Sequence, residues 1–402
     1  MANTASAERF QISDDHVRYM ALYAALIAAE ALTEPAMAGE RRLAALTRAH
    51  GIVMALRGPA HPLGFGEFRD LVRGPVAGLL PPGREDGGLG SVYAVDPETG
   101  ERNVDLEALD GEYGAVARLS GDLPYWPWLR EELAENRAYA LFMKGESQRA
   151  YVRRREFVVR HAAGLQRSLR SMPKEIEDLY VGVPGERCYG RWCFLCPLCQ
   201  WPMRVRPADG VVKVSCDDRG HRERGADYRF IRDDDREGAP ELVGIHPPPA
   251  ILARSRPLAP IAGEAQVHEA GRTQMVGPEC WHSHVVPGLL ELALYDELSK
   301  RGVAVGLWPR LDSYDLHITV QREGRPKRVW KVDVKDVISV DALIRRLERE
   351  GRQENGLYLV VPDRLESQVK LLERALAAMG WKVRAASRLA QEVCREQGVS
   401  WP

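Results

Sequence analysis

The chain has no long apolar run. No stretch of about 18 consecutive apolar residues, the length that a helix needs to cross a membrane, occurs in its 402 residues. The N-terminus, Met-Ala-Asn-Thr-Ala-Ser-Ala-Glu-Arg, also lacks the charged and then apolar layout of a secretory signal. We therefore expect a soluble, cytoplasmic protein with no membrane partner.

The chain also lacks an excess of either charge. Lys and Arg number 56, Asp and Glu number 57, and the formal net charge is −1. A near-neutral total provides no overall attraction for nucleic acid, so any such affinity depends on local basic patches. Internal repeats and long low-complexity tracts are missing as well, and the length predicts two or three ordinary domains.

Cysteine is scarce and unevenly spread. The chain has 7 cysteines, an odd number, and most of them lie between Cys188 and Cys216. This clustering favours metal binding in a reducing compartment over disulfide bonds. Cys196-Pro-Leu-Cys199 has the spacing of a zinc-ribbon knuckle, and Cys216 with His221 supplies a second pair after a short predicted hairpin.

The sequence thus predicts one zinc ion held by Cys196, Cys199, Cys216 and His221. Four protein ligands leave no open position on the metal, so the zinc is expected to be structural. Cys188 and Cys193 are surplus, and Cys193 remains an alternative to Cys196 or Cys199. A second group, Cys280, His282 and His284, lacks a fourth ligand, and we interpret it as packing or solvated side chains.

A basic stretch precedes the cysteines. Between Lys144 and Arg170 the charges are mostly arginines on a predicted helix, including Arg153, Arg154, Arg155 and Arg160. Arginine pairs bidentately with phosphate, so a cluster on one helix attracts a nucleic-acid backbone without reading its sequence. The alternatives are a solvated helix face or pairing with acidic groups of a partner.

The strongest functional signal is a predicted hairpin near the C-terminus. Residues 312–320 and 328–336 alternate apolar and polar side chains on both sides of a polar break centred on Gly324. Symmetric folding about Gly324 places Asp315 opposite Asp333, with their Cβ atoms roughly 5 Å apart. Lys335 points to the same face as Asp333. If the loop is off-centre, Asp312 competes with Asp315.

This grouping of charges predicts a catalytic metal site. Two close carboxylates repel unless one is protonated or they share a cation, and Mg²⁺ binds through one or two carboxylates with water and phosphate oxygens. Residues 286–302 have helical spacing and carry Glu291, a candidate third carboxylate. The alternative to a metal site is a surface hairpin whose charged side chains are solvated and have no catalytic role.

The order of a helix with Glu291, a strand opening with Asp315, a strand carrying Asp333-Val-Lys335, a helix and a strand resembles the PD-(D/E)xK restriction-endonuclease-like superfamily. The resemblance implies that Asp315 and Asp333 bind the catalytic Mg²⁺ or Mn²⁺, that Lys335 assists the attacking water, and that Glu291 is an auxiliary ligand. Tyr314 stands where the family motif has proline.

A narrower resemblance rests on domain order and on the phrases Asp-Ser-Tyr-Asp-Leu and Trp-Lys-Val-Asp-Val-Lys-Asp. The chain is similar to restriction-endonuclease-like subunits encoded beside prokaryotic PIWI/Argonaute-like proteins and a DNA helicase in predicted antiviral islands. This resemblance implies DNA as substrate, a role in defence, and those proteins as partners. Cleavage of both strands needs two sites, so a homodimer is a further expectation.

Two other functions remain open from the sequence. One is a non-catalytic nucleic-acid-binding adaptor that uses the zinc ribbon and the basic helix, with the nuclease fold as a scaffold. The other is a transposition or recombination endonuclease with the same chemistry. The intact acid-acid-lysine set favours a nuclease over the adaptor, because a scaffold has no need to hold like charges together.

The predicted fold is therefore a multidomain protein with a mainly helical N-terminal region, a central zinc ribbon, and a C-terminal α/β restriction-endonuclease-like domain with a mixed sheet. The helical region opens with helices from Ser13 to Ala31 and from Ala38 to Ala49, the second ended by Gly51. The expected regions are 1–175 (helical), 176–240 (zinc ribbon), 241–285 (connector) and 286–402 (nuclease).

Overall fold

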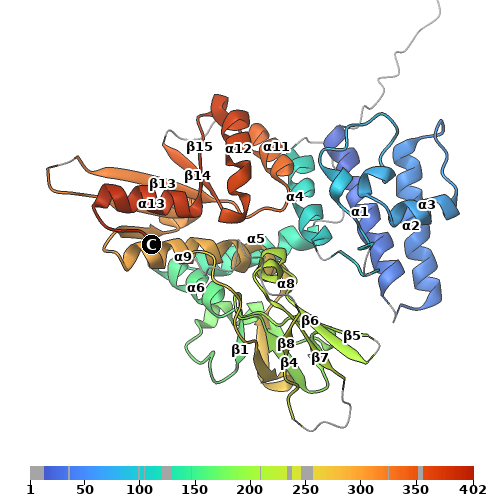
Figure 1. Ribbon diagram of the computed structural model, residues 1–402, viewed down its shortest axis with the longest axis horizontal. Helices are drawn as coiled ribbons and strands as arrows, with labels where there is room; N and C mark the ends of the chain where they lie inside the picture. The colour runs from blue at the N-terminus through green and yellow to red at the C-terminus, as the bar shows by residue number, and fades with distance from the viewer. Residues whose placement is uncertain are drawn as a thin grey trace, which may run out of the picture. The chain divides into compact units, whose positions relative to one another are not determined.

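The chain forms two compact units in a computed structural model. One unit contains residues 1–128 and 337–351, and the other contains residues 129–336 and 352–402 (Figure 1). The structure describes residues 13–34, 37–97, 100–103, 105–119, 129–145, 147–208, 210–232, 238–245, 257–324, 326–351 and 356–402.

The first unit is helical, as the sequence predicts. The Ser13 hydroxyl accepts a hydrogen bond from the His16 backbone N–H at 3.3 Å and caps the first helix. Alanines on that helix are fully buried and allow its neighbours to approach closely. The helices of this unit are α1 (Asp14–Thr33), α2 (Gly39–Arg57), α3 (Phe65–Val72), α4 (Leu106–Leu119) and α11 (Val340–Glu350).

The expected end of the second helix at Gly51 is wrong. Helix α2 continues through Gly51 to Arg57. The reason is that the apolar pattern resumes at once, with Val53 fully buried, and this packing offsets the helix penalty of about 1 kcal/mol for one glycine. The helix stops at Gly58, whose φ of 70° suits glycine.

Helix α11 belongs to the first unit although its sequence lies between two strands of the C-terminal sheet. Arg345 and Arg349 both form ion pairs with Asp15 of α1. The carboxylate of Glu112 on α4 accepts the backbone N–H groups of Ile338 and Ser339 at 2.7 and 2.8 Å. The chain therefore leaves the second unit directly after Asp336 and returns to it at Arg352.

The second unit begins with α5 (Leu129–Met143) and α6 (Gln148–Arg160), followed by three small sheets. The first sheet contains β1 (Ala163–Leu165), β10 (Thr273–Val276) and β2 (Tyr180–Gly182). The second contains β3 (Cys188–Tyr189), β4 (Trp192–Leu195) and β9 (Gln266–Glu269). The third contains β5 (Arg204–Ala208), β6 (Val211–Ser215), β7 (Asp227–Ile231) and β8 (Val243–Gly244).

The segment expected to be a connector takes part in all three of these sheets. Strand β8 pairs with β7, β9 pairs with β4, and β10 pairs with both β1 and β2. Residues 246–256 of this segment lie outside the described residues. Each of these strands is only a few residues long and pairs with strands that can lie far away in the sequence. The local sequence pattern therefore does not predict the pairing.

The C-terminal sheet has the order β11-β12-β13-β14-β15 and is mixed, as predicted. The first two pairings are antiparallel and the last two are parallel. Its strands are β11 (Ala304–Leu307), β12 (Leu316–Val320), β13 (Arg328–Val334), β14 (Leu357–Val361) and β15 (Lys382–Ala385). The accompanying helices are α9 (Val286–Ser299), α12 (Val369–Leu376) and α13 (Ala386–Gln397).

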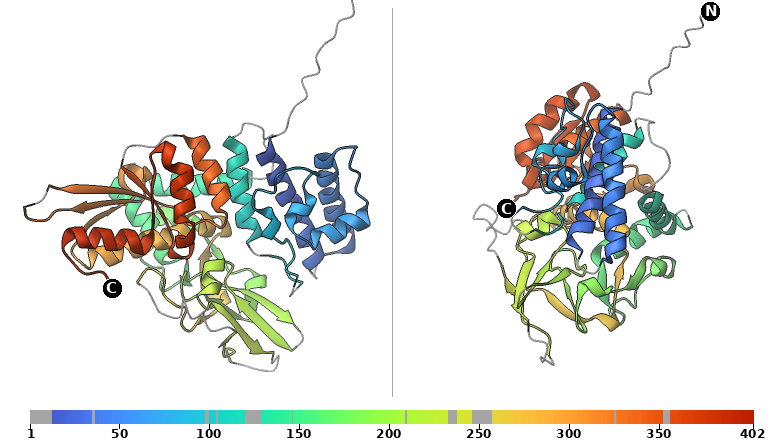
Figure 2. Two further views of the ribbon diagram at one scale, coloured as in Figure 1. Left: turned by 45° about the horizontal axis from the view of Figure 1, so that its top comes forward. Right: turned by 90° about the vertical axis from the view of Figure 1, so that its right-hand side faces the viewer.

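Alternation along β12 and β13 separates a buried face from a polar one. Leu316 and Ile318 on β12, and Trp330 and Val332 on β13, are buried in one apolar cluster that also contains residues of α9 and α13. His317, Lys331 and Asp333 point to the other face. Figure 2 shows the β12–β13 hairpin extending beyond the other strands of the sheet.

The second unit also contains three shorter helices: α7 (Arg219–Glu223), α8 (Pro278–Cys280) and α10 (Pro309–Asp312). Within the part of the chain that the structure describes, none of the helices combines the length and the apolar character needed to cross a membrane.

Candidate functional site

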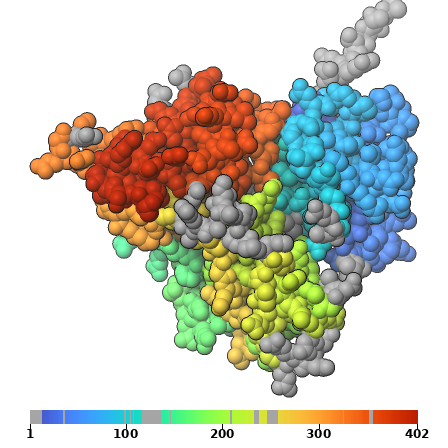
Figure 3. Space-filling view, in the orientation of Figure 1, coloured from blue at the N-terminus to red at the C-terminus, as the bar shows by residue number. Residues whose placement is uncertain are grey.

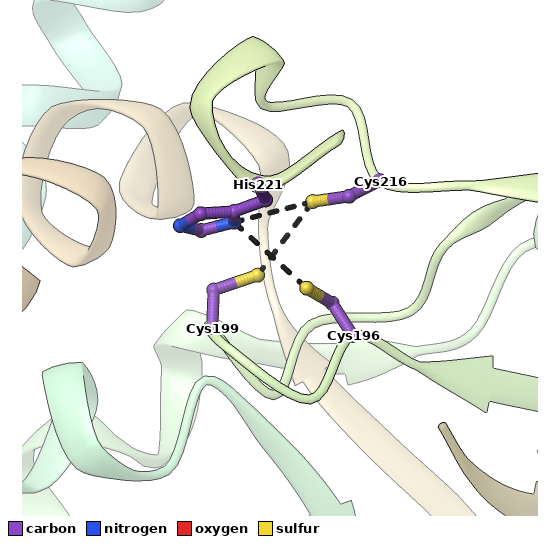
Figure 4. Close-up of side chains that lie close together, drawn as sticks. All are labelled: Cys196, Cys199, Cys216 and His221. Atoms are coloured by element: carbon purple, nitrogen blue, oxygen red, sulfur yellow. Dashed lines mark hydrogen bonds between the residues drawn. The ribbon is translucent and has the colours of Figure 1, made fainter. Parts of the chain in front are cut away.

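The four predicted zinc ligands come together in the second unit. Cys196 and Cys199 lie in the turn after β4, Cys216 follows β6, and His221 lies on α7. All four residues are buried, and their ligand atoms lie within 4.8 Å of one another. Figure 4 shows the three thiols and the imidazole converging on one point.

The separations between these ligand atoms fit a tetrahedral zinc ion. The His221 Nδ1 atom lies 3.4 Å from the Cys216 Sγ atom and 3.8 Å from the Cys196 Sγ atom. The Cys199 and Cys216 Sγ atoms are 3.9 Å apart. Zinc bonds of about 2.3 Å to sulfur and 2.0–2.1 Å to nitrogen, at tetrahedral angles, require ligand separations of roughly 3.5–3.8 Å.

The surroundings of the cluster also fit a bound cation. Burial raises the pKa of the Cys216 thiol to about 12, so without a cation this thiol stays protonated at neutral pH. The Asp218 carboxylate accepts the backbone N–H of His221 at 2.8 Å and lies 3.6 Å from the Nε2 atom of its ring. A carboxylate in this position orients a metal-binding histidine.

The surplus cysteines and the second His/Cys group stay apart from the cluster. Cys188 and Cys193 face each other across β3 and β4, away from the four ligands. His284 is buried and packs edge-on against Phe142 with ring centroids 5.1 Å apart. Among the described residues, only the Cys196 group gathers three or more ligand atoms closely enough to hold a metal.

The predicted hairpin register is confirmed. Leu316 pairs with Val332 and His317 with Lys331, as symmetric folding about Gly324 requires. The regular pairing ends at Leu316, since the Asp315 backbone N–H donates to the Val332 carbonyl at 2.9 Å. The Asp315 carboxylate accepts the N–H of Val334, the residue after Asp333, so the two aspartates lie close together. Lys335 lies on the same face and donates to the Asp333 carboxylate at 2.8 Å.

The Asp315 carboxylate lies in surroundings that oppose its negative charge. It is 8 % exposed, and its Oδ2 atom accepts the Val334 backbone N–H at 2.6 Å. Burial, followed by the neighbouring carboxylates Glu291 and Asp333, raises the pKa of Asp315 well above its usual range. A divalent cation bound between Asp315 and Asp333 would offset this repulsion, so the donor set suits Mg²⁺ or Mn²⁺.

Glu291 reaches the same region from α9 and is bound by other side chains. Its carboxylate is 1 % exposed and accepts two hydrogen bonds from Arg155 Nη2, at 3.1 and 3.2 Å. The indole N–H of Trp308 donates to the same carboxylate. Burial raises the pKa of Glu291, and the Arg155 guanidinium, which it shares with Asp312, opposes this rise.

An unusual turn leads into Asp315. Between β11 and β12 the φ angles of Trp308, Arg310, Leu311 and Asp312 are all positive, from 44° to 78°. Each such non-glycine residue costs roughly 1–2 kcal/mol, so the surroundings must hold the turn in place.

Two residues of α6 hold this turn. Gln148 accepts the Leu311 N–H and donates to the Trp308 carbonyl, both at 2.8 Å, and Arg155 forms an ion pair with Asp312. Asp312 is thus occupied by Arg155, while Asp315 lies close to Asp333. Of the two candidates, Asp315 has the geometry of the first acidic ligand.

The predicted DNA-binding arginines occupy different surroundings. Arg154 and Arg155 are buried, and Arg154 donates to the Phe142 carbonyl at 3.0 Å and pairs with Glu175 at 2.9 Å. Arg160 forms a bidentate pair with Asp296 at 2.8 and 2.9 Å. Arg153 is exposed. The positive charges of Arg154, Arg155 and Arg160 are therefore matched by carboxylates or carbonyls of the same unit.

Sequence reasoning missed the role of α6 in this site. The ion pair between Arg155 and Glu291 joins residues 136 positions apart. Nothing in the local pattern distinguishes Arg155 from its neighbours, although the burial expected for one face of an amphipathic helix offers a weak signal. The positive φ angles could not be predicted from the sequence either, because the turn contains no glycine.

The mixed sheet, Asp315, Asp333-Val-Lys335 and the buried Glu291 of α9 all lie in one stretch of the chain. Residues 288–401 match the model of the family described as "REase associating with pPIWI_RE", where pPIWI denotes prokaryotic PIWI. The match over residues 288–401 confirms the resemblance that the sequence predicted. Comparison with curated proteins and with solved structures found no match.

Proposed function

We propose that the protein is a metal-dependent endonuclease that hydrolyses phosphodiester bonds of DNA. The observation that supports the proposal is the closeness of these groups: Asp315 accepts the N–H of Val334, the residue after Asp333, and Lys335 donates to Asp333 at 2.8 Å. Mg²⁺ or Mn²⁺ held by the two carboxylates supplies a Lewis acid that lowers the pKa of a bound water and polarises the scissile phosphate.

The side chains of the site have distinct tasks in this proposal. Asp315 is oriented by the Val334 N–H and binds the cation through its second oxygen. Asp333 is the other carboxylate ligand and orients the Lys335 ammonium, which stabilises the charge that develops on the phosphate. Glu291 is an auxiliary group, since its carboxylate must leave Arg155 before it can contact the cation.

The family description supports a partner of the prokaryotic PIWI type. We propose that the chain acts with such a protein, and with a helicase, in defence against foreign DNA. The zinc cluster is proposed to hold the central sheets together and to take no part in hydrolysis, since four protein ligands leave the metal no open position.

A non-catalytic adaptor is the second candidate. It is favoured by one observation, the engagement of the Glu291 carboxylate by Arg155 and Trp308, which leaves two rather than three acidic groups for a cation. A transposition or recombination endonuclease shares the proposed chemistry and differs only in its substrate.

Cleavage of plasmid and single-stranded DNA by the purified protein, with Mg²⁺ or Mn²⁺, tests the proposal. We expect nicking or cutting by the wild type and none by Asp333→Asn or Lys335→Gln. Zinc content and thermal unfolding of each variant verify that the fold is retained. Titration of Mn²⁺ into the wild type and Asp333→Asn gives a readout that does not depend on turnover.

The outcomes separate the two candidates. Loss of Mn²⁺ binding in Asp333→Asn, with an inactive wild type, indicates a nuclease that needs its partner. Equal Mn²⁺ binding by both proteins, or by neither, contradicts the nuclease and supports the adaptor.

A further inference from the structure

The polar face of the β12–β13 hairpin carries a group of cations beside the two aspartates. We define the cationic strip as Lys327 and Lys331, with the His317 ring opposite Lys331. We propose that the cationic strip binds the phosphate backbone of nucleic acid on one side of the bond that is cut. This inference rests on the proposed function for the position of the cut, and it adds binding residues to the same site.

The face that carries the cationic strip is open along three strands. Ala304 and Gly306 of β11 are exposed, and Val329 of β13 retains 40 % of its exposure. The opposite face of the same strands is buried against the apolar cluster that includes α9 and α13 residues. In Figure 3 the hairpin, in orange, projects from the surface near the red C-terminal helices.

The strip is continuous with the aspartate pair. His317 lies opposite Lys331 in the β12–β13 register, and Asp333 lies two residues further along β13 on the same face. Side chains two residues apart on a strand are separated by about 6.8 Å. This separation is of the order of one step between neighbouring phosphates along a nucleic-acid backbone. The phosphate next to one bound at Asp333 can therefore lie near Lys331.

Lys331 lies across the two strands from His317, and Lys327, just before β13, alternates to the same face as Lys331. Cations brought this close repel one another, and an anionic backbone relieves the repulsion by displacing counterions. Their arrangement along an open face fits a chain of phosphates better than a single small anion.

Tyr314 organises the part of the strip nearest to the aspartates. Its ring is 7 % exposed, and its hydroxyl lies 2.8 Å from the His317 Nδ1 atom. The Lys331 Nζ atom lies 5.8 Å from the centroid of the same ring. Tyr314 stands where the motif of the resembling superfamily has proline, so this support for His317 and Lys331 is a feature of this chain.

The sheet offers a matched control. Lys382 on β15 also lies over a tyrosine ring, with its Nζ atom 5.3 Å from the Tyr358 centroid. Lys382 pairs with Tyr358, and Tyr358 pairs with Val332, so Lys382 points to the face opposite Lys331. Each lysine lies on a strand of the sheet and close to a tyrosine ring. The two lysines differ in the face of the sheet that they occupy.

Binding of fluorescently labelled DNA and RNA duplexes of one sequence, measured by anisotropy in EDTA over a range of salt concentrations, tests the proposal. For Lys331→Gln we expect a several-fold loss of affinity and a salt slope reduced by about 1, the value for one lost phosphate contact. Lys382→Gln should bind as the wild type does. Tyr314→Phe should show a smaller loss than Lys331→Gln. Comparison of DNA with RNA identifies the kind of backbone.

Equal effects of Lys331→Gln and Lys382→Gln, or no effect of either, would overturn the proposal, as would a wild type that binds neither duplex. Thermal unfolding shows whether each variant is folded. Because EDTA removes any catalytic metal, binding is measured independently of hydrolysis. A wild type that binds DNA through Lys331, never cuts it, and binds Mn²⁺ no better than Asp333→Asn contradicts the nuclease and supports the cationic strip. A wild type that cuts while Lys331→Gln binds normally contradicts the strip alone.

Discussion

The second unit contains two groups of buried polar side chains, and they are built on opposite principles. In the zinc cluster, four ligand atoms lie within 4.8 Å of one another. In the candidate nuclease site, three acidic groups are engaged by two cationic side chains: Glu291 and Asp312 by Arg155, and Asp333 by Lys335. The first group is ready for a permanent metal, and the second must exchange internal partners for a cation and a substrate.

The difference follows from how each site is encoded. The zinc ligands come from a knuckle and a short hairpin, so local turns bring them together. The nuclease site combines residues from α6, α9, the turn before β12, and β13, and its like charges are held apart by cations of the protein itself. A site assembled in this way retains unfavourable groups, such as Asp315, that a purely structural cluster would not need.

The largest effect should come from the zinc cluster. Cys199→Ser, or removal of the metal with a strong chelator, is expected to unfold the central sheets, because metal binding contributes on the order of 10 kcal/mol to small zinc domains. Metal analysis and thermal unfolding measure the loss. Cys188→Ser is the control, since Cys188 lies outside the cluster, and it should retain the full zinc content. A fully folded Cys199→Ser protein would contradict a structural zinc.

The next largest effect should come from Arg155. Arg155→Met leaves the carboxylate of Glu291 buried without its cation, which typically costs 3–5 kcal/mol. The double variant Arg155→Met/Glu291→Gln should recover much of this loss, because the buried charge of Glu291 is then gone and only the partly exposed Asp312 remains without Arg155. Urea unfolding of the wild type, both single variants and the double variant completes the cycle.

Arg153→Met is the matched control for Arg155. Arg153 lies on the same helix and is exposed, so its replacement should change stability by no more than about 0.5 kcal/mol. Equal losses in the free energy of unfolding for Arg155→Met and Arg153→Met would show that the buried ion pair contributes no more to stability than an exposed arginine does.

Replacement of Asp315 is expected to change the free energy of unfolding by a smaller amount, and it should stabilise the protein instead of destabilising it. Its folded-state pKa lies above the unfolded value of about 3.9, so the folded protein binds the proton more tightly and loses stability as pH rises through that window. Asp315→Asn should therefore be more stable than the metal-free wild type at pH 7. The gain should vanish below about pH 4, where the wild-type carboxyl is protonated in both states.

Thermal unfolding across this pH range, with and without Mn²⁺, checks the prediction. Mn²⁺ should raise the melting temperature of the wild type and leave that of Asp315→Asn unchanged. A variant that is less stable than the wild type at every pH would mean that the carboxylate is favourably placed without a metal.

The elements that the sequence predicted well are those with short-range signals. The hairpin register follows from alternation and from the polar break at Gly324, and the zinc ligands follow from Cys-Pro-x-Cys spacing. The turn before β12 could not be predicted, because its left-handed residues include no glycine and depend on contacts with Gln148 and Arg155 of α6. The place of α11 in the first unit depends likewise on Asp15, which lies more than 300 residues earlier in the chain.

The same distinction explains the arginines of α6. Their spacing identifies a basic helix but not which side chains face inward, since Arg154 and Arg155 are buried and Arg153 is exposed. Burial of an arginine is decided by the acidic partner that it meets. For Arg155 that partner is Glu291, whose own burial on α9 becomes evident only once the two helices pack together.

The smallest expected effect concerns a residue that lies between the two groups. Arg364 forms an ion pair with Asp336, the residue after Lys335, and its positive charge also acts on Asp218. Asp218 in turn accepts the backbone N–H of the zinc ligand His221. The ion pair is partly exposed, so Arg364→Met should lower the free energy of unfolding by no more than about 1 kcal/mol.

If the two groups are linked through this arginine, Arg364→Met should still alter both. We expect several-fold faster loss of zinc to a chelator and several-fold weaker Mn²⁺ binding, because Asp218 and the strand end at Lys335 lose the same support. Arg388→Met removes a comparable but more exposed ion pair with Glu366 and should alter neither. If the two variants behave alike, the zinc cluster and the nuclease site are independent, and their contrast in design reflects separate tasks within one unit.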